Sequence, residues 1–181
     1  KSNTLWVEYL KKDRFSSVQP ERTPSFFVEL YAYQAVIATP QPAANLLATL
    51  ATDLKGLVKA SLLSESQCQQ LDRLAHQVAP AMVSVGFDYI DAVQKNFLVS
   101  GNRVMGIDVE ALLSEQWLGI GLAKAEYRGL INPSLVITSL GESFGQQYPL
   151  VRLAFLTSYF RQKLEQGKRG HIELQALLKW I

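Results

Sequence analysis

The fold prediction starts from the stretch YIDAVQKNFLVSGNRVMGIDVE, which occupies residues 89–110. Two apolar runs, FLV at 97–99 and VMGI at 104–107, flank the small polar tripeptide SGN. Such residues accept the backbone dihedrals of a tight turn, so the pattern predicts a β-hairpin. Because a hairpin brings its two open ends together, we expect Asn96 and Asp108 to lie close to each other.

The polar residues of this stretch are those that phosphoryl transfer requires. Asp91 precedes Asn96 by five residues, and Asp108 follows the second predicted strand. A loose phosphoryl-transfer transition state leaves the protein to place a hydroxyl in line and to neutralise charge. One Asp that orients the hydroxyl, with an Asn and a later Asp that hold Mg²⁺, is the arrangement kinases use. Amide and carboxylate oxygens also suit Mg²⁺.

At these residues the segment resembles the catalytic core of protein-kinase-like phosphotransferases, in particular the aminoglycoside phosphotransferase and choline kinase branch. The sequence IDVE at 107–110 is similar to the Ile-Asp-x-Glu of that branch. The resemblance implies that Asp91 is the catalytic acid/base, that Asn96 and Asp108 are metal ligands, and that Glu110 is a further ligand or an outer group. It also implies ATP and Mg²⁺ as cofactors.

The N-terminal string LWVEYL alternates as a half-buried strand does. It resembles the last strand of a kinase N-lobe running into the hinge. The resemblance implies that residues 1–12 form this strand and hinge, and that the Glu8 carbonyl and the Leu10 amide meet the adenine edge. Residues 13–181 would then be the kinase-like, helical C-lobe, with the glycine-rich phosphate loop expected upstream of the chain's first residue.

The expected fold class is α+β and mainly helical: a protein-kinase-like C-lobe with a hinge strand and a short catalytic β-hairpin. Apolar spacing, a Thr-Pro start and a Ser-x-x-Gln capping box predict the helices. Their expected ranges are 24–38, 42–58, 65–82, 111–125 and 147–166. The sequence GIGLAK at 119–124 lacks the third glycine of a phosphate loop, and we expect a tight-packing turn or a helix start there.

Two residues depart from the pattern of the family. Tyr89 stands where the family usually has His, so the hydrogen bond that braces the catalytic loop has to be made differently. Lys95 lies on the loop just before Asn96, and we consider it a phosphate contact, since a cation there would stabilise developing charge; a solvent-exposed lysine is the alternative.

The expected function is an ATP-dependent phosphotransferase that moves the terminal phosphate of Mg-ATP to a hydroxyl of an amino alcohol, a sugar or an antibiotic-like small molecule. Asp88, Glu110 and Glu115 are expected to make the acceptor pocket acidic enough for an amine. The alternative is a catalytically inactive scaffold that binds a protein partner, which Tyr89 and the missing phosphate-binding parts favour. A protein or glycan kinase of the same superfamily is a third possibility.

Composition sets the remaining expectations. The 181 residues with 48% apolar content suit one domain, and a net charge of +2 gives no reason to expect a nucleic-acid partner. A single cysteine, Cys68, favours a reducing compartment, and no run is long enough to span a membrane. We therefore expect a cytoplasmic protein with no membrane partner.

Overall fold

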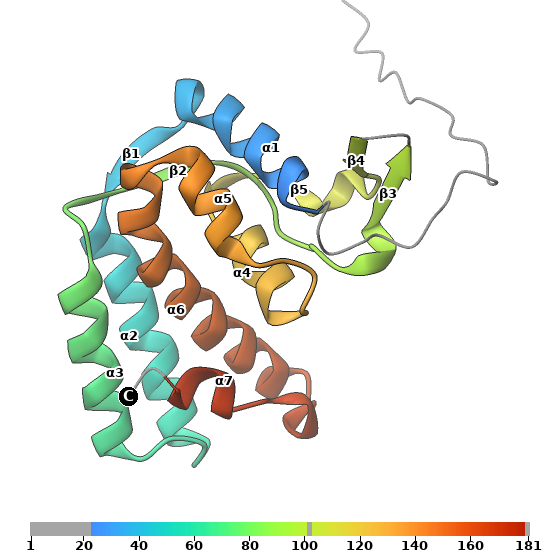
Figure 1. Cartoon of the computed structure of the whole chain (residues 1–181). Helices are drawn as coiled ribbons and strands as arrows, with labels where there is room; N and C mark the ends of the chain where they lie inside the picture. The colour runs from blue at the N-terminus through green and yellow to red at the C-terminus, as the bar shows by residue number, and fades with distance from the viewer. Residues whose placement is uncertain (1–22, 101–102, 180–181) are drawn as a thin grey trace, which may run out of the picture.

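Helices dominate the computed structural model, which describes residues 23–100 and 103–179 (Figure 1). Two small antiparallel sheets accompany them. The prediction of an α+β, mainly helical chain is therefore confirmed at this coarse level. The predicted hinge strand at 1–12, with Glu8 and Leu10, lies outside the described residues.

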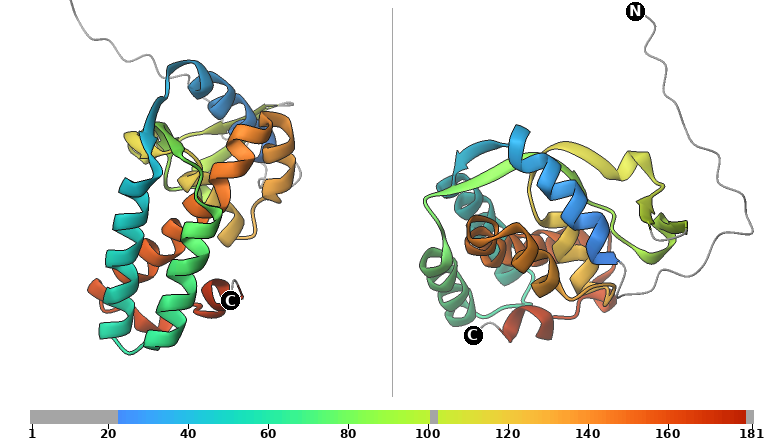
Figure 2. Two further views of the ribbon diagram at one scale, coloured as in Figure 1. Left: turned by 90° about the vertical axis from the view of Figure 1, so that its left-hand side faces the viewer. Right: turned by 45° about the horizontal axis from the view of Figure 1, so that its top comes forward.

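Three long helices form a bundle in which each contacts the other two: α2 (Ala43–Lys59), α3 (Glu65–Val78) and α6 (Glu142–Glu165). They lie side by side in two views of the molecule (Figures 1 and 2). The predicted stripe of α2 forms part of the core, since four of its leucines are buried: Leu46, Leu50, Leu54 and Leu57. The short helix α7 (Gln175–Leu178) packs against α6.

The capping box before α3 is present as predicted. The Ser64 hydroxyl oxygen accepts from the Gln67 backbone N–H at 3.1 Å, and the Gln67 side chain accepts from the Ser64 N–H at 2.9 Å. The predicted end of this helix at Met82 is wrong, because α3 ends at Val78. Met82 instead begins a strand and is 47% exposed.

A three-stranded antiparallel sheet has the order β1-β2-β5, from β1 (Thr39–Pro42), β2 (Met82–Tyr89) and β5 (Leu112–Trp117). Val85 in the central strand faces both edge strands. The predicted helix over 111–125 is wrong in its first half, because β5 pairs there with β2. Only the second half is helical, as α4 (Ile120–Tyr127).

The predicted hairpin is confirmed: β3 (Phe97–Ser100) pairs with β4 (Arg103–Gly106), with Phe97 opposite Gly106. Helix α1 (Thr23–Ile37) packs against β4 and against α5 (Pro133–Leu140). Its Phe26 ring lies 5.2 Å from the rings of both Tyr89 and Phe97, in edge-to-face contact. The hairpin is thereby attached to the end of β2. None of the helices in the described ranges is long and apolar enough to cross a membrane.

Candidate active site

Asp88, near the end of β2, joins this strand to α1 and to the start of α4. Its buried carboxylate accepts from the Gly119 N–H (2.8 Å), the Gly121 N–H (3.2 Å), the Tyr89 N–H (2.7 Å) and the Tyr31 hydroxyl (2.9 Å). Burial raises the pKa of Asp88 to about 6, although the four donors oppose the rise. The prediction that Asp88 lines an acidic acceptor pocket is therefore wrong, because its oxygens are enclosed by these donors.

The two glycines at the start of α4 allow this enclosure. Gly119 has a φ of 115°, which strains any residue with a Cβ. A Cβ on Gly121 would lie 2.3 Å from the backbone oxygen of Tyr89. The sequence GIGLAK thus forms a tightly packed helix start, as predicted.

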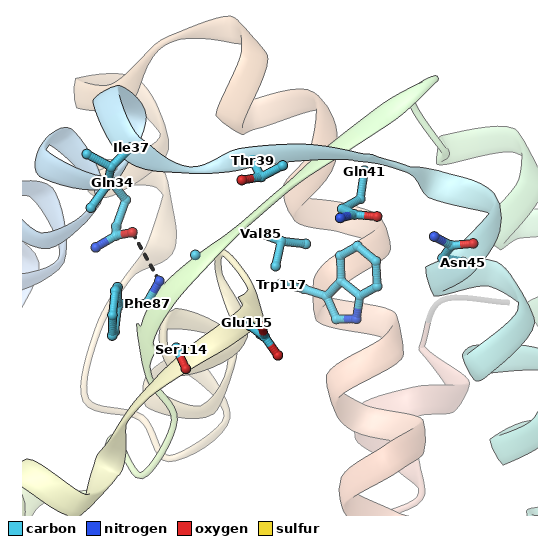
Figure 3. Close-up of a pocket in the computed structure, with 11 residues that line it drawn as sticks. Gln34, Ile37, Thr39, Gln41, Asn45, Val85, Phe87, Ser114, Glu115 and Trp117 are labelled. Atoms are coloured by element: carbon cyan, nitrogen blue, oxygen red, sulfur yellow. Dashed lines mark hydrogen bonds between the residues drawn. The ribbon is translucent and has the colours of Figure 1, made fainter.

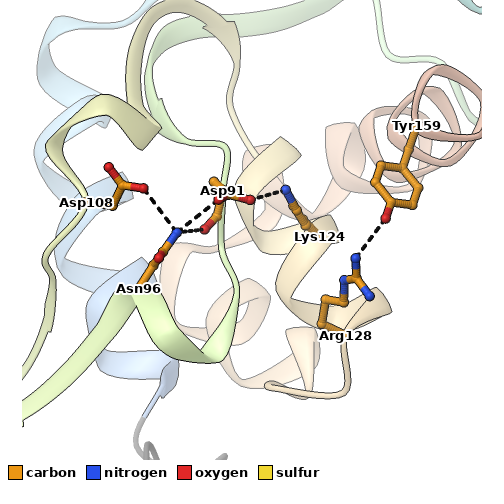
Figure 4. Close-up of polar contacts among 6 residues, drawn as sticks. All are labelled: Asp91, Asn96, Asp108, Lys124, Arg128 and Tyr159. Carbon is orange, nitrogen blue, oxygen red and sulfur yellow. Dashed lines mark hydrogen bonds and ion pairs between the residues drawn. The ribbon is translucent and has the colours of Figure 1, made fainter. Parts of the chain in front are cut away.

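Asp91, Asn96 and Asp108 converge just beyond β2, as Figure 4 shows. The Asn96 amide nitrogen donates to Asp91 Oδ2 at 3.0 Å, to the Asp91 backbone oxygen at 2.9 Å and to Asp108 Oδ2 at 3.4 Å. The prediction that the hairpin brings Asn96 and Asp108 together is confirmed. Two carboxylates and one carboxamide therefore share one small volume at the hairpin's open end.

Tyr89 holds the two ends of the hairpin together. Its hydroxyl donates to the Asn96 backbone oxygen at 2.9 Å and accepts from the Asp108 N–H at 3.2 Å. Burial raises the pKa of Tyr89 to about 12, so the hydroxyl keeps its proton at neutral pH. A tyrosine thus braces the loop at the position where the resembled family usually has His.

Lys124 is a site residue that the sequence reasoning missed. Its ammonium forms an ion pair with Asp91 Oδ1 (Figure 4), and only 15% of its side chain is exposed. The hydrogen bond from Lys124 is the main reason why the pKa of Asp91 is lowered. Lys124 follows Gly121 by three residues, so the packing of α4 on β2 turns it toward Asp91.

Lys95 and Glu110 lie at the periphery. Lys95 is exposed on the 3₁₀ turn Gln94–Asn96, and its charge contributes to the lowered pKa of Asp91 less than Lys124 does. Glu110 is exposed on the 3₁₀ turn Val109–Ala111, and it forms no ion pair with the described residues.

The donor set of the cluster fits a hard cation only in part. Within residues 23–100 and 103–179, no group of three His, Cys, Asp or Glu side chains is arranged to hold a metal. Asp91 and Asp108 supply carboxylate oxygens, and Asn96 would supply its amide oxygen if the carboxamide turned over. Because Mg²⁺ usually keeps several waters and phosphate oxygens, two or three protein oxygens are sufficient for it.

A cavity of about 470 Å³ opens beside Asp91 and Lys124, a size usual for small-molecule sites. It lies between β5, α2, α4 and α6. Its other lining residues are Leu46, Thr49, Ile90, Gln116, Trp117, Ile120, Ala154, Phe155, Ser158, Tyr159 and Gln162.

A second cavity, of about 610 Å³, lies over β1, β2 and β5 (Figure 3). Glu115 lines this second cavity and not the one beside Asp91, while Trp117 borders both. Glu110 lines neither cavity. The three acids predicted to make the acceptor pocket negative, Asp88, Glu110 and Glu115, are therefore not gathered around it.

Comparison of the chain with protein-family models, with curated proteins and with solved structures gives no match. The functional inference therefore rests on the geometry of the site.

Proposed function

We propose that the chain carries the catalytic part of an ATP-dependent phosphotransferase, which moves the terminal phosphate of Mg-ATP to a hydroxyl of a small molecule. The observation that carries the proposal is the hydrogen-bonded cluster of Asp91, Asn96 and Asp108, of which Asp91 lines a cavity of small-molecule size. A kinase needs this combination of one positioned acid and two hard-oxygen ligands.

Asp91 is proposed to receive the acceptor hydroxyl. Its Oδ2 faces Asn96, whereas its Oδ1 faces Lys124 at the cavity. A hydroxyl in the cavity can donate a hydrogen bond to this carboxylate and pass its proton there as the phosphoryl group transfers. The lowered pKa keeps Asp91 ionised at neutral pH, as an acceptor of that hydrogen bond must be.

Asn96 and Asp108 are the residues proposed to hold Mg²⁺, which when bound neutralises the charge on the nucleotide phosphates. Glu110 is proposed as an outer group of this set, and Lys95 as a phosphate contact from the exposed face of the loop. Glu8 and Leu10 remain the proposed backbone contacts of the adenine. A cytoplasmic location belongs to the same proposal.

Lys124 has two proposed roles. It holds Asp91 in one orientation, and it places a positive charge where the acceptor and the transferred phosphoryl group would meet. A preorganised cation at this point stabilises negative charge that develops in the transition state.

The test is phosphate transfer from Mg-ATP labelled at the terminal phosphate to a panel of small alcohols and sugars. We expect a labelled product, and we expect Asp91→Asn to lower kcat by at least about a hundredfold, in line with loss of a positioned base. Asp72→Asn is the matched control, because Asp72 is a partly exposed acid on α3 whose ion pair, among the described residues, is with His76 four residues along. Equal rates for both variants would contradict the proposed role of Asp91.

The second candidate is a non-catalytic scaffold, and one observation favours it. Every member of the cluster already has a partner within the site, since Asn96 donates to both acids and Lys124 pairs with Asp91. Such a network can serve structure alone. A thermal shift titration separates the two functions: a ligand that binds the native state raises the Tm. The enzyme predicts a shift with Mg-ATP that Asp108→Asn reduces, whereas the scaffold predicts no shift and no transfer.

A further inference from the structure

The cavity beside Asp91 has walls of a particular chemistry. Three aromatic rings line it, those of Trp117, Phe155 and Tyr159. Four uncharged polar side chains also line the cavity: Thr49, Gln116, Ser158 and Gln162. The Thr49 hydroxyl donates to the Asn45 backbone oxygen at 3.2 Å, the Gln116 amide donates to the Ser114 backbone oxygen at 3.0 Å, and Ser158 hydrogen-bonds the Asp53 carboxylate. The oxygens of Thr49 and Gln116 can still accept hydrogen bonds from a ligand, and the exposed amide of Gln162 can both donate and accept.

The aromatic wall is held in a fixed position. The rings of Phe155 and Tyr159 stack, with centroids 5.5 Å apart at 22°. The Tyr159 hydroxyl accepts from Arg128 at 2.8 Å (Figure 4), and the Arg128 guanidinium lies 5.9 Å from the centroid of the same ring. Trp117, on β5, is half-buried and contributes a ring from a second element. Phe155 and Tyr159 are buried, and the Lys163 ammonium also lies 5.0 Å from the Tyr159 ring centroid, so these two rings form a rigid support. Trp117 makes no ring or cation contact with the described residues, and its ring is the one we consider for contact with a ligand.

The charge of the cavity is balanced. Among the described residues that line it, Asp91 carries the one carboxylate and Lys124 the one cation, and the two form an ion pair. An ammonium group on a ligand would compete with Lys124 for Asp91 and would lie beside its positive charge. Such like-charge contact is strongly unfavourable in a partly buried site. A ligand carboxylate would find the Lys124 charge already neutralised by Asp91, so we expect it to gain little from binding there.

We infer that this cavity takes an uncharged sugar or cyclic polyol as the phosphate acceptor. This inference rests on the proposed phosphotransferase function and deepens it. The apolar C–H face of a sugar ring packs on the Trp117 ring, while its hydroxyls bond to the side chains of Thr49, Gln116 and Gln162. One hydroxyl then faces Asp91 at the end of the cavity. Of the acceptors expected from the sequence, this inference keeps the sugar and excludes the amine-bearing molecules.

The test has a binding arm that needs no nucleotide. Ligand-observed saturation-transfer NMR with the whole chain uses glucose, galactose and myo-inositol as neutral probes. Glucosamine, galactosamine and glucuronate are charged analogues that keep the sugar ring. We expect the neutral sugars to bind with dissociation constants on the order of 1 mM, and the charged ones at least about tenfold more weakly.

Two variants connect this binding to the cavity. Gln162→Ala removes an amide at the exposed rim of α6, where the fold is not at risk, and it should weaken binding about threefold or more. Trp117→Leu removes the ring on β5 and should weaken it further. Gln70→Ala is the matched control, because Gln70 is an exposed glutamine on α3 outside the cavity. Unchanged binding in Gln162→Ala and Trp117→Leu would overturn the inference.

The second arm repeats the panel as acceptors with labelled Mg-ATP. Preferred transfer to the neutral sugars supports both proposals. Sugar binding without transfer keeps the sugar site and removes the phosphotransferase. Equal or better binding or transfer with the amino sugars or glucuronate overturns the inference on acceptor class. No sugar binding at all overturns it as well, whether or not transfer to other alcohols is seen.

Discussion

The Tyr89 hydroxyl offers a direct test of how the hairpin is held at the site. In Tyr89→Phe the ring remains among Phe26 and Phe97, and only the oxygen that joins Asn96 to Asp108 is removed. The substitution therefore perturbs one bridge and leaves the packing intact.

The expected loss follows from two hydrogen bonds. Each contributes about 0.5–1.5 kcal/mol net. The Asn96 oxygen keeps a second donor, the Ile107 N–H at 3.0 Å, whereas the Asp108 N–H loses the acceptor that the Tyr89 hydroxyl provides. We therefore expect a loss of about 2 kcal/mol, equivalent to a Tm lower by about 4–8 °C in a chain of this size.

Urea unfolding followed by circular dichroism measures this loss. Tyr33→Phe is the matched control, because Tyr33 is 67% exposed on α1 and should change stability by less than about 0.5 kcal/mol. Tyr89→Phe should also slow phosphate transfer by about tenfold or more, since the spacing of Asn96 and Asp108 is then less well fixed. If Tyr89→Phe is as stable as Tyr33→Phe, the hydroxyl does not bridge the hairpin and the reasoning fails.

Three further predictions concern residues that support the site: Gly121, Asp88 and Lys124. Gly121→Ala should destabilise the chain by about 1–3 kcal/mol, because its Cβ would lie 2.3 Å from the Tyr89 backbone oxygen. Gly170→Ala is the control and should be nearly neutral, because its Cβ would meet no atom of the described residues within 4 Å. Equal urea midpoints for the two variants would contradict the predicted clash at Gly121. The pKa of Asp88 is about 6 in the folded protein against an ordinary value of 3.8, so the folded state binds the proton more tightly than the unfolded state. The resulting contribution to the free energy of unfolding, about 3 kcal/mol, is fully present below about pH 4 and is lost as the pH rises through 6. Urea unfolding from pH 4 to 7 should show that the difference in the free energy of unfolding between wild type and Asp88→Asn changes with pH. A difference that stays constant would show that Asp88 does not cause the pH dependence. Lys124→Met should raise the pKa of Asp91 toward its usual value, as measured by carboxyl ¹³C NMR titration, and an unchanged pKa would exclude Lys124 as the cause.

The local features of the fold could be predicted from the sequence. The hairpin depends on turn residues between two short apolar runs, and the start of α3 depends on a capping box. Each of these features is determined by residues that lie close together along the chain. The convergence of Asn96 and Asp108 followed from the hairpin alone. The hairpin, the capping box and the meeting of Asn96 with Asp108 are confirmed, whereas the strand predicted within residues 1–12 lies outside the described residues.

Features that depend on distant partners could not be predicted in the same way. Residues 112–117 form a strand because β2, far away in the sequence, pairs with them, and apolar spacing alone does not distinguish this from a helix. The burial of Asp88 likewise depends on distant residues, because Tyr31 and the start of α4 enclose its carboxylate. The sequence alone therefore predicts an acid that lines the acceptor pocket. Lys124 became visible as a site residue only once α4 was packed on β2.

The proposed function depends most on Asn96 and Asp108, which we propose hold a cation at a nucleotide's phosphates, beside the carboxylate of Asp91. Mn²⁺ takes oxygen ligands as Mg²⁺ does and broadens the NMR signals of nuclei near it. Titration of Mn-ATP into the isotopically labelled chain should broaden the backbone amides at 91–97 and 106–109 first. Asp108→Asn should weaken that effect. Broadening that begins elsewhere, or that is the same in Asp108→Asn, would contradict the claim.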